Sequence, residues 1–576
     1  MKYFHRPDRE HAEGQYLKAE FDKTLASSGQ LNLSGDTVVA NTGTSLTRLD
    51  GELLAMHRSS ASWAFLSETE AAVFERLRST RFQDLVQWIG SYATTLDYVS
   101  HLWRRGLVSL NGEYAVSTDM FAQGANYREG HLVELLLTEK CNLACPYCLA
   151  GAHQKMPAMD EPLAKRTIDL AFAMEEADTI AFEFAGGEPF LKYPLMRSLV
   201  TYINAHPARG SRRLFLSIQT NATLLNQKKV EWIKEHGIRV GVSLDGGAQA
   251  QNKSRPQVNG KESHSSLMKG IELLKANNVP FGGLVVLNRS NIDNAEELAD
   301  FMLKHEIHGF RINPVAYLGD ARKNWQEVGL EQEEVIVFFQ KFMQSLVKNG
   351  HPILEDNIHS MCNFLTSKQR RTRCMRADCG AGDTFQSVTA NGDIYPCGRS
   401  TQSPGLKLGN VFDSIDSLSQ PARHSIRIEE IRYRKPVQFD DCSVCNYQQL
   451  CQAGCSAQSW ERFGTVRHKT PDCQFYKTLY PWLMRWLCFD RQAYNHLNRY
   501  HYFDGEGQLF EREFLTSGTD TQTKGNTHWV AAPEQALWPT PLSKRQPKHE
   551  ASQTFVLQPM SIRETGVTIP ATTVAN

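Results

Sequence analysis

Leu132-Val-Glu-Leu-Leu-Leu137 runs almost directly into Cys141-Asn-Leu-Ala-Cys145-Pro-Tyr-Cys148, an apolar segment followed by a cluster of cysteines. The apolar segment predicts a buried strand, so the cysteines follow its carboxyl end. Three thiolates can hold a four-iron cube by three corners and leave the fourth iron open to a ligand. A zinc site is the alternative, but its usual pattern is Cys-x2-Cys with a second pair nearby. The spacing therefore favours iron–sulfur over zinc.

From residue 129 to about 345, apolar segments alternate with helical patterns such as Leu163–Met174 and Leu267–Ala276. We expect strands at 132–137, 180–184, 214–219, 239–243, 282–287 and 309–313. This alternation predicts an α/β fold, a partial (β/α)6 TIM-like barrel. In such folds the chemistry lies at the carboxyl ends of the strands. The cysteine cluster is placed where a site is expected.

Composition limits the classes of partner and compartment. A chain of 576 residues should hold three or four domains. Lys+Arg and Asp+Glu both number 63, so no overall basic field attracts nucleic acid or an anionic membrane. The N-terminus has no apolar signal region, and the apolar segment Leu479–Phe489 is too short to span a bilayer. Thirteen cysteines without an export signal favour metal over disulfides and a cytoplasmic location.

The regions on either side of the predicted barrel differ in character. In residues 1–128, Ser67 and Glu70 form a capping box, a second helical pattern follows, and Asn111-Gly112 marks a hairpin over 107–116. These features predict a winged-helix-like unit that binds a peptide strand, since a basic run is missing. Residues 346–490 form a cysteine-rich domain, and residues 491–576 are expected to be a largely disordered tail.

The cysteine cluster together with Gly186-Gly-Glu-Pro189, at the end of the second predicted strand, resembles the radical S-adenosylmethionine (radical SAM) enzymes. In these enzymes the open iron binds the amino and carboxylate groups of S-adenosylmethionine. One electron from the cluster then breaks the sulfur–C5′ bond and releases methionine and a 5′-deoxyadenosyl radical. The resemblance implies that Cys141, Cys145 and Cys148 generate this radical. Glycines let the backbone approach a ligand closely, and Glu188 could offset the ammonium of the cofactor.

Further strand-end motifs extend the resemblance. They are Gln219-Thr-Asn-Ala222, Gly241-Val-Ser-Leu-Asp-Gly246 and Phe310-Arg-Ile-Asn-Pro-Val315. In similar enzymes a serine and an arginine, here Ser243 and Arg255, fix the ribose and carboxylate of the cofactor. The planar fork of arginine suits a carboxylate, although a solvated loop arginine is the alternative. The residues that the resemblance assigns to cofactor binding are Tyr147, beside the adenine, with Gly186, Gly187, Glu188, Ser243, Arg255 and Val315.

A second group of cysteines lies at positions 374, 379, 397, 442, 445, 451, 455 and 473. The spacing Cys442-x2-Cys445-x5-Cys451-x3-Cys455 is too regular for buried structural thiols, and Gly392 to Cys397 adds a Gly-x4-Cys element. Eight thiolates make two complete four-thiolate sites, for iron–sulfur clusters or for zinc.

This group resembles the SPASM extension of peptide-modifying radical SAM enzymes. The resemblance implies one auxiliary cluster on Cys374, Cys379, Cys397 and Cys455. It implies a second on Cys442, Cys445, Cys451 and Cys473, both for electron transfer. Cys362 and Cys488 are expected to be ordinary core thiols.

The resemblance as a whole implies a peptide- or protein-modifying oxidoreductase, a maturase with S-adenosylmethionine and three 4Fe–4S clusters. A small electron donor such as flavodoxin or ferredoxin would reduce it. The N-terminal unit resembles domains that bind the leader of a ribosomally made peptide as an added strand. We therefore expect a crosslink in such a peptide as the product. Nucleic acid and membrane are not expected partners.

Two alternatives remain open. The first is oxidation of a serine or cysteine to formylglycine, as in the related sulfatase-maturating enzymes. There an aspartate base follows the Gly-x4-Cys cysteine, but Gly398 stands at this position, which disfavours that reaction. Asp383 or Asp393 could replace the base, although both are typical of turns. The second alternative is a zinc-bearing scaffold without catalysis.

Overall fold

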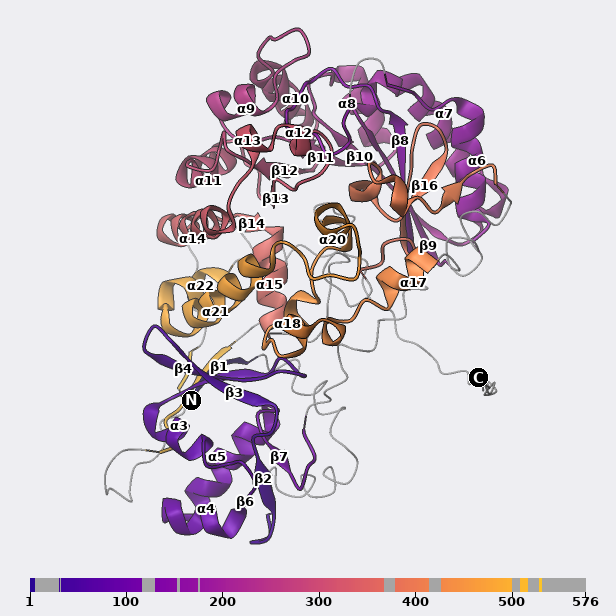
Figure 1. Cartoon of the computed structure of the whole chain (residues 1–576). Coiled ribbons are helices and arrows are strands. Elements are labelled where there is room, and N and C mark those ends of the chain that lie inside the picture. The colour runs from indigo at the N-terminus through magenta and orange to yellow at the C-terminus, as the bar shows by residue number, and fades with distance from the viewer. Residues whose placement is uncertain are drawn as a thin grey trace, which may run out of the picture.

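The computed structural model describes the chain except for several segments. The described residues are 1–5, 31, 33–115, 130–152, 156–174, 177–366, 379–413, 426–499, 508–515 and 528–530. Figure 1 shows a large α/β unit at one end, an N-terminal unit at the other, and the segments with the later cysteines between them. Of the cysteines predicted as ligands, Cys374 lies outside the described residues.

A single ten-stranded sheet forms the core of the α/β unit, with the order β14-β13-β12-β11-β10-β9-β8-β15-β16-β17 among the described residues. Each strand from β8 to β14 is parallel to the next, β15 is parallel to β8, and β16 and β17 continue antiparallel. The strands are β8 (Gly130–Thr138), β9 (Thr179–Gly186), β10 (Arg213–Thr220), β11 (Arg239–Ser243), β12 (Phe281–Leu287), β13 (Gly309–Pro314), β14 (Leu354–Glu355), β15 (Phe385–Val388), β16 (Asp393–Tyr395) and β17 (Gly409–Asn410).

The strands β8 to β13 are the six that the sequence predicts, so the α/β fold with a mostly parallel sheet is confirmed. Within the described residues the sheet ends at β14 and β17 and stays open. The helices are α6 (Glu161–Phe172), α7 (Tyr193–Asn204), α8 (Gln227–Glu235), α9 (Ala248–Ser254), α10 (His264–Ala276), α11 (Ala295–Lys304), α12 (Asp320–Lys323), α13 (Trp325–Val328), α14 (Gln332–Asn349) and α15 (Asp356–Thr366).

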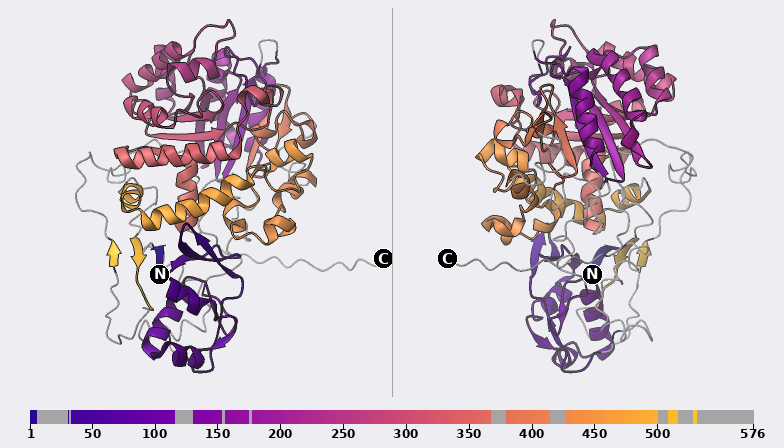
Figure 2. Two further views of the ribbon diagram at one scale, coloured as in Figure 1. Left: turned by 60° about the vertical axis from the view of Figure 1, so that its left-hand side comes forward. Right: turned by 90° about the vertical axis from the view of Figure 1, so that its right-hand side faces the viewer.

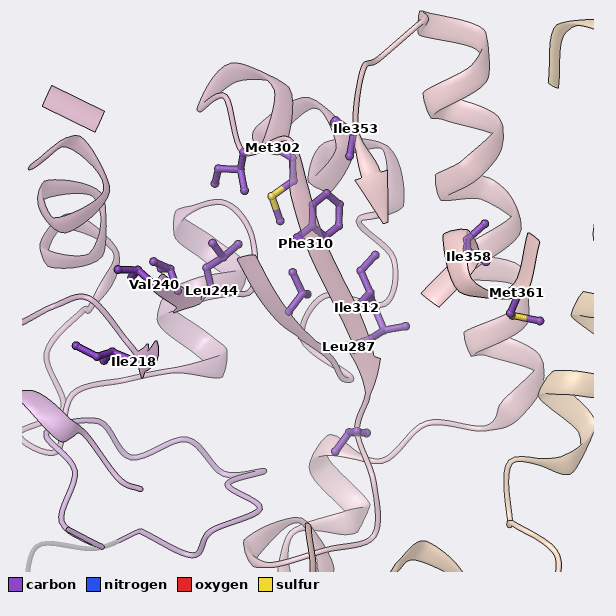
Figure 3. Close-up of a cluster of buried hydrophobic side chains, with 14 of the residues drawn as sticks. Ile218, Val240, Leu244, Leu287, Met302, Phe310, Ile312, Ile353, Ile358 and Met361 are labelled. Atoms are coloured by element: carbon purple, nitrogen blue, oxygen red, sulfur yellow. The ribbon is translucent and has the colours of Figure 1, made fainter. Parts of the chain in front are cut away.

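The two faces of the sheet differ because strand residues alternate in direction. Alternate apolar residues of each strand pack under the helices, and Figure 3 shows part of this core with Phe310 and Ile312 of β13 beside Met302 of α11. The intervening positions are less buried, as in β13 (Arg311 and Asn313 are half-buried). In most parallel sheets helices cover both faces, so every position of a strand is apolar.

The face away from the helices, which we call the inner face, instead carries polar side chains. These are Glu134, Glu183, Ser217, Gln219, Ser243, Arg311, Asn313 and Ser387. A polar and partly accessible face inside a parallel sheet is the expected place for a site.

The N-terminal unit contains two small sheets and several helices. Its larger sheet has the order β19-β18-β1-β5-β4-β3, and the smaller has the order β6-β2-β7. The elements are β1 (Lys2–His5), β2 (Val38–Ala40), β3 (Thr44–Leu49), β4 (Glu52–His57), β5 (Trp63–Leu66), β6 (Thr80–Arg81) and β7 (Ser109–Leu110), with α3 (Glu68–Phe74), α4 (Phe82–Ile89) and α5 (Tyr92–Arg104).

In the N-terminal unit the predicted capping box and tight turn are both present, whereas the pairing of β7 with β2 was not predicted. The capping box forms, because Ser67 Oγ accepts from Glu70 N and the Glu70 carboxylate accepts from Ser67 N. Asn111 and Gly112 adopt φ values of 50° and 84° in a tight turn closed by Leu110 and Glu113. Among the described residues, which stop at residue 115 in this part of the chain, the bridge is the one strand contact between the two arms of the predicted hairpin, and β7 pairs with β2. The larger sheet was not predicted, and the winged-helix likeness stays a prediction.

Part of the segment predicted to be a disordered tail is ordered. Helix α21 (Cys473–Phe489) is followed by α22 (Arg491–Arg499), and β18 (Gln508–Glu511) pairs with both β1 and β19 (His528–Val530). Phe514 and Leu515 are buried in the N-terminal core. These pieces are ordered because short strands gain stability from a distant partner, here the first residues of the chain, and the largely disordered character of the tail as a whole stays a prediction.

The N-terminal unit packs directly against the rest of the protein, as both views of Figure 2 show. Trp63 Nε1 donates to the carbonyl of Leu365 at 2.9 Å, and the rings of Phe65 and Phe489 meet at 5.0 Å. Asn446 Nδ2 donates to Ser45 Oγ at 2.6 Å, which links β3 to the cysteine-rich segment. Among the described helices, none combines the length and apolar character needed to cross a membrane.

Candidate active site

The predicted radical-generating cysteines lie in the loop after β8, at the carboxyl edge of the sheet. Cys141, Cys145 and Cys148 are all half-buried, and Cys148 N donates to the carbonyl of Cys145 at 3.1 Å. Burial raises the pKa of Cys141 to about 11, and it raises the pKa of Cys145 further, with added repulsion from the other two sulfurs. The three thiols therefore lie close together. Without a metal centre their raised pKa values would keep them protonated, whereas a metal centre would bind them as thiolates.

Gly186 and Gly187 let two backbone segments cross at close range. A Cβ on Gly186 would overlap the carbonyl oxygen of Thr138, and one on Gly187 would overlap that of Lys140. Gly187 N donates to Thr138 O at 2.7 Å, and Glu188 N donates to Lys140 O at 2.9 Å. The observed close approach is therefore to the backbone leading into Cys141. These glycines anchor the cysteine loop to the end of β9.

The Glu188 side chain has a different environment from the one predicted. Its carboxylate is fully buried and accepts from Phe190 N at 3.0 Å, Thr220 Oγ1 at 2.8 Å and Asn221 N at 2.9 Å. Burial raises the pKa of Glu188, while these donors favour its charged form. The side chain connects the ends of β9 and β10, and its contact with a ligand ammonium stays a prediction. It also fixes Asn221, whose amide nitrogen lies 3.8 Å from Cys141 Sγ.

Arg255 is buried next to the cysteines, so the alternative of a solvated loop arginine is wrong. It is 7% exposed and lies at the end of α9, where its Nη2 donates to Asp245 Oδ1 at 3.1 Å. Asp245 also accepts from Val286 N at 3.0 Å and from the Tyr147 hydroxyl. The guanidinium lies 5.5 Å from the centre of the Tyr147 ring. Its charge lowers the otherwise raised pKa of Cys145, which places it beside the cysteine loop.

One donor of Arg255 is left for a ligand. Arg255 Nε is buried and has no hydrogen-bond partner within the described residues. A buried donor without a partner is costly, so an acceptor group is expected to fill this place. A carboxylate beside the cysteine loop fits this requirement.

The other predicted cofactor residues lie at the same edge of the sheet. Ser243 ends β11 on the inner face, and its Oγ accepts from Gln219 Nε2 at 2.9 Å. Val315 follows β13 and donates its N–H to Leu287 O at 2.8 Å. Sequence reasoning did not single out Asp245 or Gln219 as site residues, although both fall within motifs that it quoted. Their partners come from distant strands, which the motifs alone do not reveal.

Two carboxylates on the inner face form a second feature that sequence reasoning missed. Glu134 and Glu183 lie directly opposite each other in the β8–β9 register. Glu134 accepts from Ser387 Oγ, and Glu183 accepts from Ser217 Oγ at 3.2 Å. Burial raises the pKa of both, and the charge of Glu134 raises the pKa of Glu183 further. Adjacent buried carboxylates of this kind share a proton.

The Glu134 carboxylate lies beside the residue that follows Cys397. A Cβ on Gly398 would come 2.5 Å from Glu134 Oε2, so a larger residue there would force this carboxylate to move. The two aspartates considered as a replacement base are engaged elsewhere. Asp383 pairs with Arg432 at 2.9 Å, and Asp393 pairs with Lys407 at 2.6 Å. Glu134 is therefore the carboxylate that the structure places next to Gly398.

Four of the later cysteines are electrostatic neighbours. Burial raises the pKa of Cys442 to about 11, with repulsion from Cys473 and Cys445. Burial likewise raises the pKa of Cys451 to about 12, with repulsion from Cys445, Cys442 and Cys473. Cys442, Cys445, Cys451 and Cys473 are therefore close enough for each charge to affect the pKa of another member of the set.

Of the other later cysteines, three lie near Arg434 or near the apolar cluster of Ala381, Leu406, Ile431 and Val466. Cys379 and Cys397 pack around this cluster, and Cys455 and Cys379 both act on the charge of Arg434. Cys374 is outside the described part of the chain. Cys362 and Cys488 are buried in the main core, as expected of structural thiols. Among the described side chains, no three His, Cys, Asp or Glu are placed to hold one metal ion together.

Comparisons with known proteins agree with this arrangement. A family model described as the radical SAM superfamily matches residues 135–302. An uncharacterized protein of Methanocaldococcus jannaschii is 32% identical over 49% of this chain and 89% of its own. A cysteine-type anaerobic sulfatase-maturating enzyme of Clostridium novyi is 23% identical over 60% of this chain and 92% of its own. A serine-type anaerobic sulfatase-maturating enzyme of Bacteroides thetaiotaomicron is 26% identical over 56% of this chain and 81% of its own.

Among solved structures, native anSMEcpe with bound AdoMet and the Cp18Cys peptide matches with a TM-score of 0.55. The match covers 64% of this chain and 99% of that one at 19% identity. At this identity the match shows a shared fold.

Proposed function

Because the chain belongs to the radical SAM superfamily, we propose that it is a maturase that modifies a peptide or protein through a radical. The reaction begins with removal of a hydrogen atom from a side chain or an α-carbon of the substrate. We propose that the product is a crosslink in a ribosomally made peptide. Relatives named as anaerobic sulfatase-maturating enzymes support the wider class.

The buried group of Tyr147, Asp245 and Arg255 beside the cysteine loop carries this proposal. Within this group Asp245 fixes the Arg255 cation, whose Nε is a buried donor without a partner among the described residues. The group lies beside the three thiols at the carboxyl edge of the sheet. In the proposed site, Cys141, Cys145 and Cys148 hold a 4Fe–4S cluster, and Arg255 Nε pairs with the carboxylate of S-adenosylmethionine. When bound, the cluster and S-adenosylmethionine supply a 5′-deoxyadenosyl radical that abstracts the hydrogen atom.

The surrounding residues keep this group in place. Asp245 holds Arg255 and Tyr147 through charge-assisted hydrogen bonds, which are the stronger kind. Glu188 holds Asn221 against Cys141, and the backbone contacts of Gly187 fix the start of the loop. Ser243 and Val315 complete the proposed cofactor contacts at the ends of β11 and β13.

Removal of one hydrogen atom leaves a substrate radical, and bond formation then requires loss of one more proton and one more electron. We assign the proton to the Glu134 carboxylate on the inner face. Its raised pKa makes it a better base than an ordinary glutamate, and Glu183 beside it lets the proton be shared. Glu134 also lies next to Gly398, so the proton acceptor is adjacent to Cys397.

Auxiliary 4Fe–4S clusters would accept the electron. We propose that Cys442, Cys445, Cys451 and Cys473 hold one cluster, in keeping with their mutual repulsion. Cys379, Cys397 and Cys455, together with Cys374, would hold the other. Fully ligated clusters suit electron transfer because they have no open iron. A flavodoxin or ferredoxin in the cytoplasm is the proposed donor.

The N-terminal unit is proposed to bind the substrate leader. Strand β3 lies at the edge of its sheet and pairs with β4 alone among the described strands. An exposed strand edge can add a peptide through backbone hydrogen bonds. The Asn446–Ser45 contact places this edge near the cysteine-rich segment.

Formylglycine formation is the second candidate, because the named relatives are of both the cysteine and serine types. Mass spectrometry of co-expressed candidate peptides separates the two reactions. A crosslinked product loses two hydrogens and does not react with an aldehyde probe. An aldehyde in the product would contradict the crosslink and support the second candidate. A protein that binds zinc and forms no 5′-deoxyadenosine would contradict both.

A further inference from the structure

We propose that Arg434 is a positioning residue that holds the turn between Cys451 and Cys455 and tunes both auxiliary clusters electrostatically. This inference rests on the proposed function of the later cysteines. Arg434 follows α17 (Ile426–Arg432), and the turn lies between α19 (Gln448–Cys451) and α20 (Ser456–Phe463). The two cysteines that flank the turn belong to different proposed clusters. A residue that sets this turn therefore acts on both.

The turn itself has an unfavourable backbone. Gln452, Ala453 and Gly454 have φ values of 51°, 60° and 68°, which places three consecutive residues in the left-handed region. For Gln and Ala this conformation is disfavoured, because the Cβ atom crowds the backbone carbonyl. Such a conformation persists only where surrounding contacts hold it.

The guanidinium of Arg434 supplies those contacts. It is 5% exposed and donates to Ala453 O and Gly454 O, both at 2.8 Å. Its remaining partners tie the turn to neighbouring segments and are Val466 O at 2.7 Å, Ser459 Oγ at 3.0 Å and His468 O. Only arginine offers five N–H donors in a fixed planar fork. A lysine at this position keeps the charge but cannot make the same bonds.

The charge of Arg434 points to anions in the two cysteine sets. Within the described residues the neighbouring Arg427, Arg432 and Arg467 pair with carboxylates but Arg434 does not, and a buried cation without an anion is costly. Burial lowers the pKa of Arg434, while Cys455, Cys379, Cys442 and Cys451 oppose this by favouring the charged form. The first two belong to one proposed cluster and the last two to the other. Because the guanidinium also donates to the carbonyls of the turn between Cys451 and Cys455, a proposed cluster on either side of this turn would supply the missing negative charge.

A nearby cation favours the reduced, more negative state of an iron–sulfur cluster, so it raises the reduction potential. Arg434 should raise the potentials of both auxiliary clusters. It should have less effect on the cluster held by Cys141, Cys145 and Cys148, since its hydrogen bonds go to the turn between Cys451 and Cys455 and to Ser459, Val466 and His468.

The test uses full-length enzyme, reconstituted anaerobically, with Arg434→Gln, Arg434→Lys and the control Arg467→Gln. Arg467 lies nearby but is 71% exposed, and it pairs with Glu430. Iron and sulfide content, redox titration by electron paramagnetic resonance, and 5′-deoxyadenosine formation are measured for each. The wild type should carry about twelve irons per chain. A wild type with zinc or about four irons would contradict the proposed auxiliary clusters themselves, before any variant is considered.

We expect Arg434→Gln to lower both auxiliary potentials, or to lose auxiliary iron, while 5′-deoxyadenosine formation stays within about twofold of wild type. Arg434→Lys should keep potentials closer to wild type, because the charge remains, but bind less auxiliary iron. Full iron content with unchanged potentials in Arg434→Gln would overturn the proposal. So would an equal effect of Arg467→Gln, or a loss of all three clusters, which would indicate general unfolding.

Discussion

Replacing Asp245 by asparagine should destabilise the protein strongly, because it leaves the buried Arg255 without its counter-ion. Arg255 Nη2 and Asp245 Oδ1 are 3.1 Å apart, and both side chains are almost fully buried. At an effective dielectric constant of about 20, two unit charges at this distance attract by about 5 kcal/mol. Removing one partner of a buried pair typically costs about 3–5 kcal/mol, in agreement with this value. We therefore expect the free energy of unfolding to fall by about 3–5 kcal/mol.

Urea unfolding of wild type and Asp245→Asn, followed by tryptophan fluorescence, measures this loss. Glu334→Gln is the matched control, because Glu334 pairs with Arg289 at the surface, where the two side chains are 35% and 43% exposed. A surface pair contributes about 1 kcal/mol or less, so the control should change little. The reasoning would be refuted if Asp245→Asn cost no more than the control. Arg255 would then have to find its counter-charge elsewhere.

Three further variants test the inner face and the cysteine loop. Glu134→Gln should reduce product formation by at least about 100-fold, the usual contribution of a general base, while 5′-deoxyadenosine still forms; an unchanged product yield in the mass spectrum would exclude Glu134 as the proton acceptor. Because burial raises the pKa of Glu183, the folded protein favours the protonated side chain, and its contribution to the free energy of unfolding is full at low pH and is lost as pH rises through the folded-state pKa. In Glu183→Gln this pH-dependent loss of stability should disappear, as measured by unfolding between about pH 4 and pH 9. Gly187→Ala should lower iron content, because its methyl group overlaps the Lys140 carbonyl at the start of the cysteine loop; a variant with wild-type iron would show that the loop tolerates the shift.

Much of the fold was predictable because its signals are local. The strands β8 to β13 are apolar runs of the right length, and the helices between them bury one face. The capping box of Ser67 and Glu70 lies within a single turn of chain, and the structure contains it. The position of Cys141 to Cys148 after a strand follows from the same reasoning. Features of this kind depend on neighbours in the sequence.

What could not be predicted depends on partners far along the chain. Strand β18 forms on β1, whose residues are some five hundred positions earlier. Glu134 and Glu183 become a pair only through the register of two parallel strands, and the neighbouring Gly398 comes from a third segment. A signal was present, since each glutamate interrupts an apolar run. The sequence alone does not show that the two interruptions coincide.

The roles of individual site residues were also harder to predict than their positions. Glu188 lies where a ligand contact was expected, but three protein donors occupy its carboxylate. Arg255 was predicted to bind the cofactor, with a solvated loop position as the alternative, and the structure buries it against Asp245. In both cases the sequence identifies the residue type and the place. The hydrogen-bond partners then determine what the side chain can do.

The formation of 5′-deoxyadenosine tests the central claim most directly. The anaerobically reconstituted enzyme is mixed with S-adenosylmethionine and dithionite, and the products are measured by liquid chromatography and mass spectrometry. A variant with Cys141, Cys145 and Cys148 replaced by alanine serves as the comparison. We predict methionine and 5′-deoxyadenosine in equal amounts from the wild type, and neither from the variant, which should lack about four irons. A wild type with its full iron content that leaves S-adenosylmethionine intact would contradict the account.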